Sequence, residues 1–174
     1  MKKILITSIL LVFCLTKFSY INAQVTPEKQ TGLVWHTSME EAYQLSKANK
    51  KPIFALFTGS DWCIWCKRLE ANVFAKQEFI DWANKNVILL ELDFPRRKQL
   101  APELAQQNQG LQQALKITGY PTIYILFAEK KDAASNFNLN PIGTLGYPQG
   151  AVEGQEQLKF LENANLIMSK IKAN

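Results

Sequence analysis

Apolar residues follow two different patterns along the chain, and these patterns alternate from about residue 33 onward. Three continuous apolar runs, PIFALFT, NVILLELDF and TIYILFA, occupy residues 52–58, 86–94 and 122–128. Short runs of this kind are typical of strands that are covered on both faces of a sheet. Residues 33–37, LVWHT, form a shorter strand candidate ahead of them.

Segments with the apolar spacing of helices separate these strands. The first helix should begin after Ser38, which has Glu41 three residues later as in a capping box, and should end near Asn49. Further helices are expected over residues 76–85, over 99–116 with a break at Gly110, and over 153–171. In the last helix, one side should carry most of four apolar residues, Leu158, Leu161, Leu166 and Met168.

The order of these segments predicts an α/β fold. Strands that alternate with helices form a central mixed β-sheet with helices on both faces. Residues 24–32 are polar and without periodicity, so they should form a short N-terminal arm before a single domain over residues 33–174. A domain of this length buries enough surface for a hydrophobic core.

The first 23 residues have the composition of a secretory signal peptide. Lys2 and Lys3 precede an apolar run over residues 4–16, and Ala23 offers a cleavage point. This run is shorter than the roughly 20 apolar residues that a membrane-spanning helix needs. The mature chain is therefore expected in the periplasm or outside the cell.

Removing this leader changes both the charge and the cysteine count. The whole chain has a net charge of +5, and the leader holds three lysines and no acid, so the mature chain would carry +2. A nearly neutral surface without a long run of like charges gives no indication of a nucleic-acid partner. Cys14 would leave with the leader, since bulky Phe13 precedes it where a lipoprotein signal has a small residue.

The two remaining cysteines both lie in SDWCIWCKRLE, residues 60–70. Their spacing fits half of a metal site, a small structural disulfide or a redox centre. Structural zinc needs four ligands, and His36 is the only histidine, so no metal is expected. A disulfide across three residues contributes only about 2 kcal/mol in the chain-entropy model, against about 5 for a 100-residue loop.

A redox centre explains the position of the pair as well as its spacing. After Gly59, either Ser60 or Asp61 is expected to cap a helix with Cys63 in its first turn and Cys66 on the same face. The free N–H groups at a helix start stabilise a thiolate, which is the reactive form of cysteine. Cys63 should therefore attack, and Cys66 should resolve the product.

The chain resembles thioredoxin-fold thiol-disulfide oxidoreductases from about Leu33 to Ile171. The motifs that carry the resemblance are DWCIWC and, 55 residues after Cys66, TGYPT. In this family the proline of the second motif is cis and packs against the cysteines, which implies a cis bond at Pro121. The backbone of Tyr120 would then pair with an extended substrate segment. A simple trans turn is the alternative.

Two aromatic residues and one acid complete the expected site. Trp62 and Trp65 would shield the cysteines and contact the substrate, with ordinary packing as the alternative. Thioredoxins usually carry a buried acid six residues before the first cysteine, where this chain has Phe57. Glu91, enclosed by leucines in a buried strand, is a candidate proton relay in its place, because burial raises a carboxyl pKa. The alternative is that Glu91 lies at a strand end open to water.

These expectations describe a periplasmic or secreted oxidoreductase that exchanges disulfides with protein substrates. Reduction is the expected direction, although the Ile64-Trp65 dipeptide between the cysteines matches no familiar reductant, oxidant or isomerase. A disulfide oxidase or isomerase, or a peptide-binding module with an inert disulfide, remains open. No cofactor is expected, the chain should be a monomer, and a reductase in an oxidising compartment would need electrons from a membrane donor.

Overall fold

The computed structural model of the chain describes residues 32–132 and 136–172. The expected leader with Cys14, and all but the last residue of the expected arm, lie outside these residues. A five-stranded sheet with the order β1-β3-β2-β4-β5 forms the centre of the fold. Its strands are β1 (Trp35–His36), β2 (Ile53–Thr58), β3 (Ile88–Asp93), β4 (Thr122–Glu129) and β5 (Asn138–Leu145).

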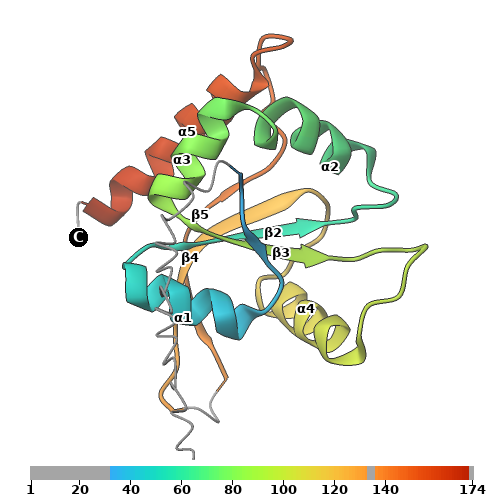
Figure 1. Cartoon of the computed structure of the whole chain (residues 1–174), viewed down its shortest axis with the longest axis vertical. Coiled ribbons are helices and arrows are strands. Elements are labelled where there is room, and N and C mark those ends of the chain that lie inside the picture. Colours follow the sequence, from blue (N-terminus) through green and yellow to red (C-terminus); the bar gives the residue numbers. More distant parts are fainter. Residues whose placement is uncertain (1–31, 133–135, 173–174) are drawn as a thin grey trace, which may run out of the picture.

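The sheet is mixed, as predicted. β1, β3 and β2 run parallel to one another, whereas β4 pairs antiparallel with β2, and β5 pairs antiparallel with β4. The helices are α1 (Met39–Asn49), α2 (Ile64–Leu69), α3 (Gln77–Asn86), α4 (Pro102–Ala114) and α5 (Glu156–Lys172), and a π-helical turn, η1 (Glu70–Phe74), continues α2. Helices α1 and α4 cover one face of the sheet, and α2, α3 and α5 cover the other (Figure 1). None of the helices in the described part of the chain is long and apolar enough to span a bilayer.

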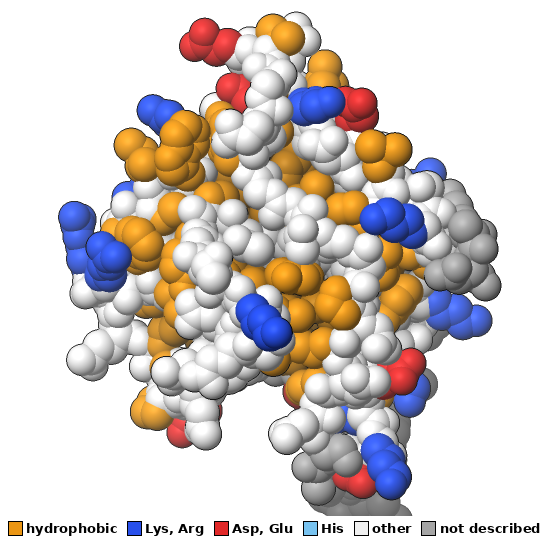
Figure 2. Space-filling view, turned by 180° about the vertical axis from the view of Figure 1, so that it is seen from behind, with side chains coloured by type: hydrophobic (Ala, Val, Ile, Leu, Met, Phe, Trp, Pro, Cys, Tyr) orange, Lys and Arg blue, Asp and Glu red, His pale blue; other side chains and the backbone are white. Residues whose placement is uncertain are grey.

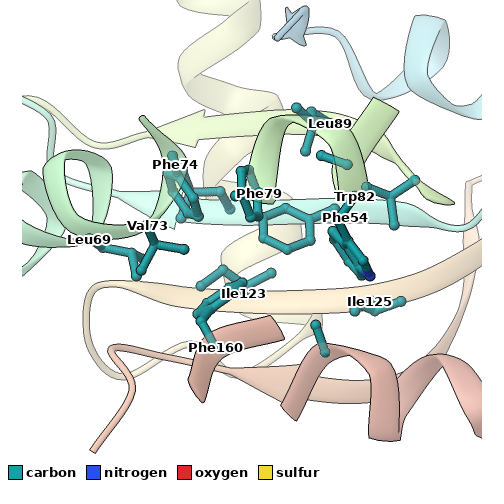
Figure 3. Packing of buried hydrophobic residues seen from close by; sticks show 14 of the residues in the cluster. Phe54, Leu69, Val73, Phe74, Phe79, Trp82, Leu89, Ile123, Ile125 and Phe160 are labelled. Atoms are coloured by element: carbon teal, nitrogen blue, oxygen red, sulfur yellow. The ribbon is translucent and has the colours of Figure 1, made fainter. Parts of the chain in front are cut away.

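Strand β2 is apolar throughout because both of its faces are covered. Phe54 faces α3 and α5, where its ring lies 5.8 Å from that of Phe79 and 6.2 Å from that of Phe160 (Figure 3). Ile53 and Phe57 face the opposite side and pack in a second buried cluster with α1 and α4. All three side chains are fully buried, which confirms the prediction of a strand covered on both faces.

The start of α1 confirms the predicted cap. Ser38 has extended backbone angles, and its hydroxyl accepts a hydrogen bond from the Glu41 N–H at 3.3 Å. The Glu41 carboxylate lies 3.0 Å from the imidazole of His36 instead of completing the capping box. His36 therefore has a partner in the first helix.

Two details of the helix prediction are wrong. Gly110 does not break α4, which runs without interruption between Pro102 and Ala114. A glycine inside a helix costs only about 1 kcal/mol relative to alanine, and the buried neighbours Asn108 and Leu111 hold this segment in place. The core face of α5 also differs from the prediction, because Leu158 and Leu166 are 49% and 61% exposed. Its buried apolar residues are Phe160, Ala164 and Ile167, and of the four predicted residues only Leu161 and Met168 pack against this core.

One edge of the sheet brings three distant loops together. Thr58 at the end of β2 pairs with Asp93 at the end of β3, and Phe57 pairs with Thr122 at the start of β4. Consequently the loop after β2, the loop between β3 and α4, and the turn before β4 all meet at this edge. Both predicted motifs lie in these loops.

Candidate active site

Cys63 and Cys66 form a disulfide at the start of α2, with their Cα atoms 5.3 Å apart. Cys63 is itself the N-cap of this helix, and its sulfur accepts a hydrogen bond from the Cys66 N–H at 3.2 Å. The expectation that Ser60 or Asp61 caps the helix, with Cys63 in its first turn, is therefore wrong. The carboxylate of Asp61 is engaged elsewhere, and the Cys63 sulfur takes the place of a capping oxygen.

Exposure does not distinguish the two cysteines. Cys63 is 5% exposed and Cys66 is 7% exposed. The hydrogen bond does distinguish them, because the Cys66 N–H points at the Cys63 sulfur and would stabilise a thiolate there. The assignment of Cys63 as the attacking residue stays a prediction that depends on this contact.

Asp61 ties the cysteine loop to the loop between β3 and α4. Its carboxylate accepts hydrogen bonds from the backbone N–H groups of Arg96 at 3.0 Å and Arg97 at 2.7 Å. Loss of water around Asp61 would by itself raise its pKa, but these N–H groups lower the pKa below the ordinary value. The Asp61 carboxylate therefore binds backbone N–H groups of the neighbouring loop and not the side chains of its arginines.

Asp93 makes a second connection between the same loops. Its Oδ1 accepts from the Ser60 N–H at 2.9 Å, and its Oδ2 accepts from the Ser60 hydroxyl at 2.7 Å and lies 2.9 Å from Lys98 Nζ. Burial would raise the pKa of Asp93, but the bonds from Ser60 and Lys98 outweigh it and lower the pKa. Sequence reasoning missed this residue. Its signal was an acid at the end of a buried strand, beside the expected site.

Trp62 lies in the space between these loops. Its indole N–H donates to the main-chain oxygen of Phe94 at 2.8 Å, and the guanidinium of Arg96 lies 3.7 Å from its ring centroid. The indole passes directly over Gly59, where a Cβ atom would lie 2.5 Å from the ring. A glycine is therefore required there by the close approach of Trp62.

The Tyr120-Pro121 bond is cis, as the family resemblance implied. The ring of Tyr120 stacks on Phe94 at 5.3 Å and meets Trp62 edge-on at 5.8 Å. The Tyr120 hydroxyl accepts from Gln112 at 2.6 Å, and burial raises its pKa. The structure thus brings Trp62, Tyr120 and Pro121 to the edge of the sheet that carries the cysteine pair.

Trp65 lies on the other side of the pair and is not a core residue. It is 45% exposed, with its ring 5.0 Å from that of Tyr147 and the guanidinium of Arg68 4.7 Å from its centroid. The adjacent Ile64 is 60% exposed. Both residues between the cysteines are thus open to a binding partner.

A cavity of about 290 Å³ lies behind the cysteine pair. Cys66, Glu91 and Pro121 are among the residues that line it. Glu91 is half-buried, and burial, followed by the nearby charge of Asp93, raises its pKa. Phe57, where thioredoxins have their acid, is fully buried against the opposite face of the sheet. The cavity brings Glu91 and Cys66 together, and the role of Glu91 as a proton relay stays a prediction.

Metal ligands do not gather in this site. Over residues 32–132 and 136–172, no three side chains of histidine, cysteine, aspartate or glutamate are placed to hold a metal ion.

The chain is similar to known proteins of one family. Residues 34–128 match a protein family described as thioredoxin-like. The disulfide bond reductase DsbH of Chlamydia pneumoniae is 36% identical over 124 residues, which are 71% of this chain and 74% of that protein. The thioredoxin-related protein DsbJ of the same organism is 27% identical over 135 residues, which are 78% of this chain but 37% of DsbJ.

Solved structures agree with this fold. A DsbH oxidoreductase superposes with a TM-score of 0.65 at 27% identity, over 84% of this chain and 91% of that chain. A thioredoxin from Thermus thermophilus superposes with a TM-score of 0.55 at 16% identity, over 80% and 89% of the two chains, and supports the fold alone. With its Cys63–Cys66 disulfide, the chain belongs to the thioredoxin-like family and is a thiol-disulfide oxidoreductase.

Proposed function

We propose that the mature chain is a periplasmic or secreted disulfide reductase that acts on protein substrates. The observation that carries this proposal is the Cys63–Cys66 pair at the start of α2, with the Cys66 N–H directed at the Cys63 sulfur. The reductive direction is supported by 36% identity to a protein named disulfide bond reductase. The location is supported by the resemblance of residues 1–23 to a signal peptide.

The reaction begins with the reduced pair. The Cys63 thiolate attacks one sulfur of a substrate disulfide, forms a mixed disulfide and expels the other substrate sulfur as a thiolate, which takes up a proton. Cys66 then loses its proton and attacks the Cys63 sulfur. The mixed disulfide breaks, the second substrate thiolate leaves, and the Cys63–Cys66 disulfide forms. The substrate gains two electrons and the protein loses two.

Glu91 is the group that can receive the Cys66 proton. It lines the same cavity as Cys66, and its raised pKa brings a carboxylate closer to the range in which it exchanges protons near neutral pH. The acid that thioredoxins usually place at the position of Phe57 is absent. Glu91 therefore acts from the neighbouring strand, on the side of the sheet that faces Cys66.

Substrate binding uses the residues around the pair. The backbone of Tyr120, held by the cis bond to Pro121, pairs with an extended substrate segment in the manner of an added strand. Trp62 and Trp65 provide apolar contact on either side of the sulfurs. Because each turnover oxidises the pair, a dithiol donor must return two electrons, and in an oxidising compartment the donor is membrane-bound. The chain acts as a monomer.

The reduction potential of the pair tests the direction of the reaction. A value near that of thioredoxin, about −270 mV, supports a reductase, whereas a value near about −120 mV indicates an oxidant. Insulin reduction by the parent should exceed that of a variant with both cysteines replaced by serine. Equal rates for the two proteins would indicate an inert disulfide and would contradict the proposal.

A further inference from the structure

Each tryptophan beside the cysteine pair carries an arginine on its ring. Trp62 precedes Cys63 and has the guanidinium of Arg96 at 3.7 Å, and Trp65 precedes Cys66 and has that of Arg68 at 4.7 Å. A guanidinium that stacks on an indole keeps its N–H donors available at the edge for a carboxylate. The two stacked arginines therefore lie next to the two residues that precede the reactive sulfurs.

The loop that carries Arg96 and Arg97 is fixed to the cysteine loop by its backbone. Asp61 accepts hydrogen bonds from both backbone N–H groups, at 3.0 and 2.7 Å, and not from the guanidinium groups. Lys67 likewise donates to the main-chain oxygen of Asp61 at 3.2 Å. These contacts hold three basic residues beside the site, and their side chains form no salt bridge with Asp61.

The basic rim, defined here as Lys67, Arg68, Arg96 and Arg97, is exposed, and the acid closest to it, Asp61, is engaged with backbone N–H groups. None of the four forms a salt bridge within the described part of the chain, whereas the neighbouring Lys98 is paired with Asp93 at 2.9 Å. Basic side chains lie beside hydrophobic ones on the left edge of Figure 2, where α2 and the loop between β3 and α4 are seen from behind. Exposed cations around an apolar, reactive centre complement a partner that is apolar at the cysteine and acidic beside it.

We propose that the basic rim selects protein substrates that have aspartate or glutamate close to the reactive cysteine. This inference rests on the proposed function and adds the class of substrate. Carboxylates of the substrate bind Arg96, Arg97 and Lys67 on the Trp62 side and Arg68 on the Trp65 side. The acidic charge also speeds the encounter, because opposite charges steer association at low ionic strength.

Three peptide disulfides of equal length test the selection. The cysteine is flanked by glutamates in the first peptide, by serines in the second and by lysines in the third, and each is reduced by the reduced protein at low and high salt. The glutamate peptide should be reduced about fivefold faster than the serine peptide at low salt, and the lysine peptide more slowly than either. The difference should shrink as salt is added.

Two double variants distinguish selection among the peptides from an effect on the reduction rate of all peptides. Arg96→Gln with Arg97→Gln should lower the ratio of the glutamate rate to the serine rate by about twofold, because Lys67 and Arg68 remain. Lys47→Gln with Lys85→Gln removes the same charge from exposed residues near the ends of α1 and α3, and should leave the ratio unchanged. If the first variant slows all three peptides equally, the basic rim acts on the cysteine and not on the substrate, and this inference is wrong. If no peptide is reduced by the parent, the proposed function itself fails.

Discussion

Asp93 binds both polar groups of Ser60, accepting from its N–H at 2.9 Å and from its hydroxyl at 2.7 Å. Asp93 ends β3, and Ser60 lies three residues before Cys63. The carboxylate thus connects the loop that carries the cysteine pair to the end of the neighbouring strand. Because the loop has this anchor, the position of Cys63 depends on a residue outside the cysteine motif.

Replacing Asp93 with alanine should destabilise the protein. The Ser60 N–H and hydroxyl lose their acceptor, at a cost of about 1–3 kcal/mol in the free energy of unfolding, which urea denaturation measures. Lys98→Gln is the control, since removing one exposed ion pair costs less than about 1 kcal/mol. Equal losses in the two variants would mean that the ion pair, and not the contact with Ser60, stabilises the loop.

The same residue gives the stability a pH dependence. Because the folded pKa of Asp93 is lowered, its contribution is present above the unfolded pKa of about 3.9 and is lost as the pH falls through the folded pKa. The difference in unfolding free energy between the parent and Asp93→Asn should therefore shrink as the pH is lowered from about 6 to about 3. A difference that stays constant over this range would show that the charge of Asp93 is unimportant.

Glu91→Gln should slow thiol-disulfide exchange and leave the folded protein at least as stable as the parent. Burial raises the pKa of Glu91, so the folded state favours the protonated form, and this stabilisation is lost as the pH rises through the folded pKa. Glutamine removes the carboxylate, whose charged form burial disfavours, and cannot accept the Cys66 proton. Exchange near pH 7 should fall by roughly tenfold or more, while the melting temperature is unchanged or higher. A pH–rate profile that overlays the parent's would exclude Glu91 as the relay.

Gly59→Ala and Gly110→Ala should have opposite effects. The first places a methyl group 2.5 Å from the Trp62 ring, forces the indole away from Phe94, and should cost about 1–3 kcal/mol. The second meets nothing within 4 Å and should stabilise α4 by about 0.5–1 kcal/mol. Thermal unfolding and Trp fluorescence, with Trp62→Phe to identify the signal, measure both effects. Similar stability in the two variants would show that Trp62 has room to move.

Single cysteine variants should trap substrates unequally. Cys66→Ala leaves an attacking residue without its resolving partner, so mixed disulfides with substrate proteins should accumulate as bands that vanish on reduction. Cys63→Ala should give few, because the remaining thiol lacks the position at the helix cap. Labelling of the reduced parent by a small alkylating agent should likewise begin at Cys63. Equal trapping by both variants would contradict the assignment of roles.

The fold was predictable because its strands carry a strong local signal. β2, β3 and β4 are mostly apolar on both faces, because helices cover both faces of the sheet. The cis bond at Pro121 and the pairing of Cys63 with Cys66 followed from short motifs with fixed spacing. These features depend on residues that are close in the sequence.

The cap of α2 and the loop between β3 and α4 were not predictable in the same way. Aspartate is a common helix N-cap, yet Asp61 binds N–H groups 35 and 36 residues away, because the sheet brings the two loops together. Asp93 and Arg96 likewise act through contacts with residues 60 and 62, more than 30 positions earlier. No local pattern distinguishes such an acid from an ordinary cap or a solvated charge.

Asp61 holds this loop through main-chain N–H groups, so the hydrogen bonds that anchor the loop do not depend on the side chains at positions 96 and 97. Any residue except proline supplies the same N–H, so positions 96 and 97 can exchange their side chains while the anchor persists. Two substitutions at these positions could remove half of the positive charge of the basic rim and keep the cysteine pair, the cis bond and the strand edge intact. Substrate preference is thus free to evolve on a redox centre that stays the same.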